Sequence, residues 1–119
     1  MDIELVEEEI LQQMIQDTSA DVLPLLIEHY IEESTERIDT MNNAFIERDA
    51  KTLEFESHTL GSSSLALGNR ELSDLARKIE HLCLKGQSEE AFEYHHELID
   101  IAQRSLVALA HRNTLGFSE

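Results

Sequence analysis

One histidine, His58, stands out because small side chains follow it where a helix would normally carry larger ones. Residues 57–68 read SHTLGSSSLALG, so a glycine and three consecutive serines come shortly after this histidine. An imidazole is a nucleophile that is largely neutral near pH 7, and small neighbours leave it open to a bulky reactant. A small-substrate enzyme would instead need a concave pocket. The segment therefore indicates a nucleophile presented to another macromolecule.

The helix that would carry His58 has a continuous apolar face. At about 100° per residue, one face of residues 50–67 collects Leu53, Ser57, Leu60, Ser64 and Leu67. His58 lies roughly 160° from Leu60 on the same count and is expected to point outward. A glycine inside a helix costs about 1 kcal/mol relative to alanine. Its presence here favours a role other than helix stability.

The residues around His58 predict a surface for access and docking. Small side chains one turn after the histidine would leave the imidazole uncovered, and apolar side chains on the outward half would form a margin for a partner. A carboxylate lies one turn before it. The predicted set consists of Glu54, Phe55, Gly61, Ser62 and Leu65.

Two other interpretations of this segment remain. The glycine–serine run could be a loop that ends the helix at Leu60, which would make His58 an ordinary surface residue. The helix is favoured because the apolar stripe continues in phase to Leu67, and Gly68-Asn69 is a better stop signal. A serine hydrolase would need a G-x-S-x-G elbow after a strand, and the sequence offers neither.

Apolar residues at helical spacing predict helices along most of the chain. The expected segments are 3–16, with a stripe that begins at Ile3, then 21–47, 50–67 and 70–85, and a last helix from Ser88 onward. Pro24 suits the first turn of the second segment, while Asp49 and Ser88 are expected N-caps. We therefore predict an all-α fold in one domain, residues 1–119. It would be an antiparallel four-helix bundle with its core at about 21–112 and a short N-terminal capping helix.

The composition limits the classes of partner. A net charge of −16 repels phosphate backbones and anionic membranes, so binding of nucleic acid or membrane is not expected. Cys83 is the only cysteine, and the acidic start MDIELVEEEI is unlike a secretory signal, so we expect a cytoplasmic protein. No ligand spacing supports a bound metal or cofactor. No second apolar stripe demands a dimer, so a monomer is expected.

The segment around His58 resembles the motif of the histidine-containing phosphotransfer (HPt) domain family of bacterial multistep phosphorelays. That motif reads approximately H-x-L-K-G-S-S-x-x-L-G, and the residues that match it in register are His58, Leu60, Ser63, Ser64, Leu67 and Gly68. The resemblance extends over most of the chain, including the turns at Asp49 and at Lys85-Gly86. Two positions depart from it. Gly61 replaces a lysine that helps to hold the phosphoryl group in the family, and Ser62 replaces a glycine.

The resemblance implies that His58 accepts a phosphoryl group from a receiver-domain aspartate and passes it to another receiver. The implied partners are the receiver domains of hybrid sensor kinases and response regulators. The sequence has no G-x-x-x-x-G-K or G-x-G-x-x-G motif for ATP, so it is not expected to be a kinase. Mg²⁺ is expected from the partner's acidic pocket. Without the lysine at 61, an alternative stays open: a helical module that binds receiver domains and is not phosphorylated.

Overall fold

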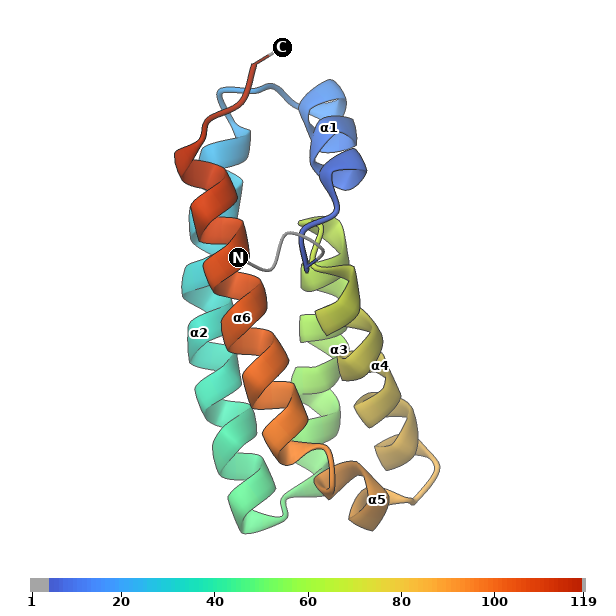
Figure 1. Cartoon of the computed structure of the whole chain (residues 1–119). Coiled ribbons are helices and arrows are strands. Elements are labelled where there is room, and N and C mark those ends of the chain that lie inside the picture. Colours follow the sequence, from blue (N-terminus) through green and yellow to red (C-terminus); the bar gives the residue numbers. More distant parts are fainter. Residues whose placement is uncertain (1–4, 119) are drawn as a thin grey trace.

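The computed structural model describes residues 5–118, and helices account for most of them (Figure 1). The helices are α1 (Glu8–Asp17), α2 (Leu23–Glu47), α3 (Ala50–Ala66), α4 (Arg70–Leu84), α5 (Ser88–Phe92) and α6 (His95–Thr114). The described part of the chain contains no strand. α2, α3, α4 and α6 run up and down alternately, and each packs against two of the others. The predicted all-α four-helix bundle is confirmed.

The core lies between the four long helices and is built from leucine, isoleucine and alanine. Each helix buries the side chains that repeat every three or four residues, as packing of helix on helix requires. On α3 the predicted inward face is buried along its whole length: Leu53, Ser57, Leu60, Ser64 and Leu67. The rest of the α3 surface is thereby left for contacts with neighbours and solvent, and His58 lies there.

The turn between α3 and α4 is pinned by the N-terminal segment. Gly68 has a φ of +89°, and its carbonyl accepts a hydrogen bond of 2.8 Å from the backbone N–H of Glu7. Asn69 is fully buried; its amide donates to the carbonyl of Leu5 at 2.9 Å and accepts from the hydroxyl of Tyr30 at 2.8 Å. Burial raises the pKa of Tyr30 far above its ordinary value, which keeps this hydroxyl a donor.

These contacts place α1 over the α3–α4 turn, beside the ends of α2 and α6 (Figure 1). α1 is thus the short capping helix that the sequence predicts. It begins at Glu8 rather than at residue 3, because residues 5–7 are used to reach the turn. Ile3, the expected start of its apolar stripe, lies outside the described residues.

The last predicted helix is two helices in the structure. α5 ends at Phe92 and α6 begins at His95, and the predicted N-cap at Ser88 is wrong because Gln87 holds that position. The apolar stripe predicted for this helix is confirmed from Ala102 onward and wrong at its first two positions; its residues are Phe92, Ile99, Ala102, Leu106 and Leu109. Ala91 and Leu98 are fully buried, whereas Phe92 is only half-buried. The break lets α5 cover the end of α4 before α6 returns along α2.

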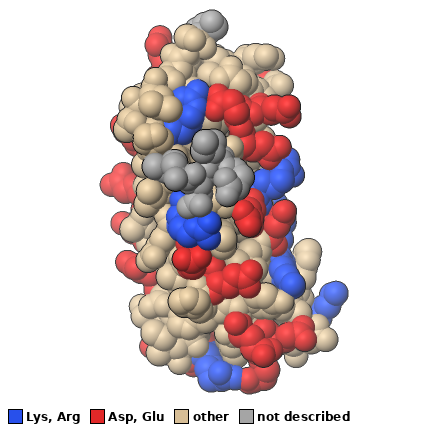
Figure 2. Space-filling model, in the orientation of Figure 1, with Lys and Arg blue, Asp and Glu red and all other residues tan. Residues whose placement is uncertain are grey.

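The surface carries the acidic excess of the sequence. Figure 2 shows Asp and Glu over much of one face, with Lys and Arg in small separate groups. Within the described residues, every helix is too short or too polar to cross a bilayer.

Candidate functional site

The helix that carries His58 runs without interruption from Ala50 to Ala66. Asp49 caps it as predicted, accepting a hydrogen bond of 3.1 Å from the backbone N–H of Thr52. The serines do not end the helix. Ser63 donates to the carbonyl of Thr59 at 3.0 Å, and Ser64 donates to its own helix in the same way. Such bonds satisfy a serine hydroxyl inside a helix. The alternative in which the helix ends at Leu60 is therefore wrong.

His58 projects from α3 beside α4, and 63% of its side-chain surface is exposed. Its Nδ1 lies 2.7 Å from Oε2 of Glu80, whose side chain is only 11% exposed. A carboxylate can only accept, so this bond requires a proton on Nδ1. In the neutral ring the lone pair is then on Nε2, at the edge of the ring away from Glu80. The sequence interpretation did not include Glu80.

The predicted docking residues lie within two turns of His58 on α3 but differ in exposure. Phe55 is 68% exposed and Ser62 is exposed, whereas Glu54 and Leu65 are half-buried. An exposed aromatic side chain next to a nucleophile is a contact surface available to a partner. Their roles in docking stay predictions.

Gly61 does not leave open space beside the imidazole as expected; it is buried beneath Arg77 of α4. A Cβ built on Gly61 would lie 3.0 Å from Cγ of Arg77, 3.6 Å from Nε and 3.8 Å from Cζ. A Cβ-to-carbon distance of 3.0 Å is tighter than ordinary van der Waals contact. Glycine at this position therefore lets the arginine side chain cross α3 one turn after His58.

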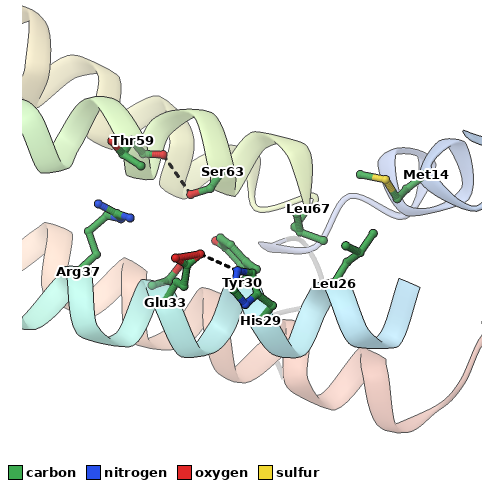
Figure 3. Close-up of a pocket in the computed structure, with 10 residues that line it drawn as sticks. Met14, Leu26, His29, Tyr30, Glu33, Arg37, Thr59, Ser63 and Leu67 are labelled. Carbon is green, nitrogen blue, oxygen red and sulfur yellow. Dashed lines mark hydrogen bonds and ion pairs between the residues drawn. The ribbon is translucent and has the colours of Figure 1, made fainter. Parts of the chain in front are cut away.

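A pocket of about 230 Å³ lies on a different side of α3 (Figure 3). It opens between α2 and α3, with Glu33 and Arg37 on one wall and Thr59 and Ser63 on the other. His58 faces α4 instead, through its bond to Glu80. The imidazole is thus on the outer edge of the α3–α4 pair and not in this pocket.

Several other histidines have structural partners or lie on the surface. His95 stacks on Phe45 with ring centroids 4.6 Å apart and bonds to Asn42 at 2.7 Å. His29 is exposed and lies 2.8 Å from Glu33 on the same helix. These contacts give His95 and His29 structural roles, and neither side chain needs a role in chemistry to explain its position.

Cys83 is half-buried and packs against the core. Burial, and then the charge of Glu54, raise the pKa of its thiol. A raised pKa keeps the thiol protonated and weakens it as a nucleophile. His58 is therefore the better candidate for nucleophilic chemistry on this side of the bundle.

The fold and the site define a class: a four-helix bundle in which an exposed imidazole, oriented by a buried carboxylate, lies on the edge of a helical hairpin. The family model described as "Hpt domain" matches residues 25–112, and the chain belongs to this family. Hpt domains are histidine phosphotransfer intermediates of phosphorelays that interact with receiver domains; they are not kinases.

A solved structure has the same fold. The chain is similar to the crystal structure of histidine-containing phosphotransfer protein B (HptB) from Pseudomonas aeruginosa PAO1, with a TM-score of 0.84 and 16% sequence identity. The alignment covers 95% of this chain and 97% of that one. Comparison with curated proteins finds no match.

Proposed function

We propose that His58 accepts a phosphoryl group from an aspartyl phosphate of one receiver domain and gives it to an aspartate of another. The observation that carries this proposal is the bond between Nδ1 of His58 and the buried carboxylate of Glu80. That bond fixes one ring nitrogen as a donor and leaves the other as a free nucleophile on an exposed side chain.

The chemistry follows from this arrangement. The lone pair of Nε2 attacks phosphorus, an N–P bond forms, and the P–O bond to the receiver's aspartate breaks. The leaving group is the receiver's carboxylate, so no proton needs to move. The ring gains a positive charge in this step, and the Glu80 carboxylate is placed to neutralise it. Onward transfer is the same step in reverse, with a second receiver's aspartate as the nucleophile.

The partner would supply the remaining groups. Phosphoryl transfer depends mainly on positioning and on charge neutralisation by a metal ion, and Mg²⁺ is expected in the receiver's acidic pocket. The exposed ring of Phe55 and the half-buried Leu65 support docking of a partner around His58. We expect donor and acceptor to be receiver domains of a hybrid sensor kinase and a response regulator. We also expect the chain to act as a cytoplasmic monomer.

The test uses the full chain with Mg²⁺ and a panel of receiver domains from the source organism, each labelled with ³²P on its aspartate. The expected result is label on this chain that is labile in acid and stable in base, as an N–P bond requires. His58→Gln should carry no label, while its helical circular dichroism matches that of the parent chain. Label that persists in His58→Gln would refute the assignment.

The second candidate function is a helical module that binds receiver domains without accepting phosphate. Gly61 favours it, because this chain lacks the motif lysine at that position. Binding of unlabelled chain to a receiver, together with no transfer of label across the panel, would support this candidate instead.

A further inference from the structure

Arg77 differs from the other arginines of the chain in having no acidic partner within residues 5–118. Five of the six arginines pair with a carboxylate: Arg37, Arg48, Arg70, Arg104 and Arg112. Among the described residues, none pairs with Arg77, although the chain contains 25 acidic side chains. An unpaired guanidinium in so acidic a protein is available to an anion from outside.

The position of Arg77 brings its guanidinium to the side of α3 that carries His58. Arg77 lies one turn before Glu80 on α4, and Gly61 lies one turn after His58 on α3. The two helices are antiparallel, so the contact between Arg77 and Gly61 lies three residues along the helices from the His58–Glu80 bond. Three residues of helical rise correspond to about 4.5 Å. Nε and Cζ of the arginine lie within 4 Å of the point where a Cβ at position 61 would be.

The side chain also crosses the place from which a lysine at 61 would project. A residue with a Cβ at 61 would meet Cγ of Arg77 at 3.0 Å, so the two side chains compete for one space. The arginine side chain occupies this space from α4, because Gly61 on α3 has no side chain to fill it. A cation from α4 therefore lies against α3 one turn after His58, although the helix of the histidine does not supply it.

We propose that Arg77 binds the phosphoryl group carried by His58, so that the cation of this site comes from α4. This inference rests on the proposed function. A phosphoryl group carries up to two negative charges and three acceptor oxygens, and a guanidinium can donate to two of those oxygens in parallel. No bond is made or broken by the arginine. It stabilises charge on the group while His58 holds it.

The test compares Arg77→Gln with Lys78→Gln, which removes the same charge from the next residue of α4. The ammonium of Lys78 lies over the ring of Tyr94, 4.8 Å from its centre, and serves as the matched control. The full chain is loaded with phosphoramidate, a small phosphoryl donor that needs no partner, and the phosphohistidine is titrated by ³¹P NMR. A nearby cation favours the dianion, so Arg77→Gln should raise the titration midpoint by about half a pH unit. Lys78→Gln should leave it unchanged, and Arg77→Lys should fall between.

A second test moves the positive charge from position 77 on α4 to position 61 on α3. In Arg77→Ala the midpoint should rise, and the double variant Arg77→Ala/Gly61→Lys should restore it, because alanine frees the space that the new side chain needs. Lysine is a better helix former than glycine, so the added residue should not weaken the fold. Equal midpoints in Arg77→Gln and Lys78→Gln would refute this role while leaving His58 phosphorylation intact. A parent chain that phosphoramidate and receivers both fail to load would refute the proposed function itself, and this inference with it.

Discussion

Replacing Glu80 should slow phosphorylation of His58 without weakening the fold. The carboxylate is nearly buried and bonds to Nδ1 of His58 at 2.7 Å. Hydrogen bonds to a charged group contribute about 1.5–3 kcal/mol, and the exposure of the imidazole places this one at the lower end. A loss of about 1.4 kcal/mol from the transition state is a tenfold loss of rate. We therefore expect Glu80→Met to be phosphorylated about ten times more slowly, and Glu80→Gln to be intermediate because its amide oxygen can still accept.

The stability of the fold should not fall together with the rate of phosphorylation. Replacing a buried ionised group by an apolar one of similar size is often neutral or stabilising. Glu80→Met should therefore unfold in urea at the same or a higher midpoint than the parent chain. A rate loss that accompanies unchanged or raised stability separates a role in the chemistry from a role in folding.

The assay is the rate at which phosphoramidate converts the chain to its phosphorylated form, followed by intact mass. ¹⁵N NMR of the imidazole reports which ring nitrogen carries the proton, and Glu80→Met should lose the preference for Nδ1–H. Glu32→Gln, an exposed position on α2, is the control for loss of one negative charge. If Glu80→Met reacts at the parent rate with the same tautomer, the carboxylate does not prepare the nucleophile and the reasoning is wrong.

Two further predictions concern the fold. Gly68→Ala should lower the free energy of unfolding by about 2 kcal/mol in urea, because a side chain at positive φ costs 1–2 kcal/mol and its Cβ would lie 3.2 Å from the carbonyl oxygen of Glu7. Gly86→Ala, also at positive φ but with nothing within 4 Å, should cost less, and equal losses would contradict the contact. The hydrogen bond from Arg112 lowers the pKa of Glu8, so this pair stabilises the fold above the unfolded pKa of about 4.3 and ceases to do so as pH falls through the folded pKa. Glu8→Gln should cost about 0.5 kcal/mol at pH 7 and nothing near pH 2, and a deficit that persists in acid would exclude the ion pair as its cause.

The bundle and the orientation of His58 could be predicted because they depend on local periodicity. The apolar stripe of residues 50–67 continues in phase, and the stop at Gly68-Asn69 coincides with the observed end of α3. The break before α6 could not be predicted in this way. Ala91 is buried although alanine is a weak hydrophobic signal, so the stripe was assigned to the larger Phe92.

Glu80 was missed because its contact with His58 joins two helices. The sequence does contain a signal for it. An antiparallel hairpin brings together residues that are equally far from its turn, and His58 and Glu80 each lie 11 residues from Asn69. Gly61 and Arg77 obey the same rule at 8 residues. Helical periodicity alone does not give this register. To predict which residues pair across the hairpin, the turn must be placed correctly and residues must be counted from it along both helices.

The groups that we propose to act on the phosphoryl group all belong to α3 and α4, on one edge of the bundle. A donor and an acceptor must therefore occupy the same edge, and they cannot do so together. Relay through this chain should therefore follow a ping-pong mechanism, in which the donor receiver dissociates before the acceptor receiver binds. Double-reciprocal plots of initial rate against donor concentration, at several acceptor concentrations, should be parallel lines. An excess of unphosphorylated donor should slow phosphoryl transfer to the acceptor because it occupies the same edge.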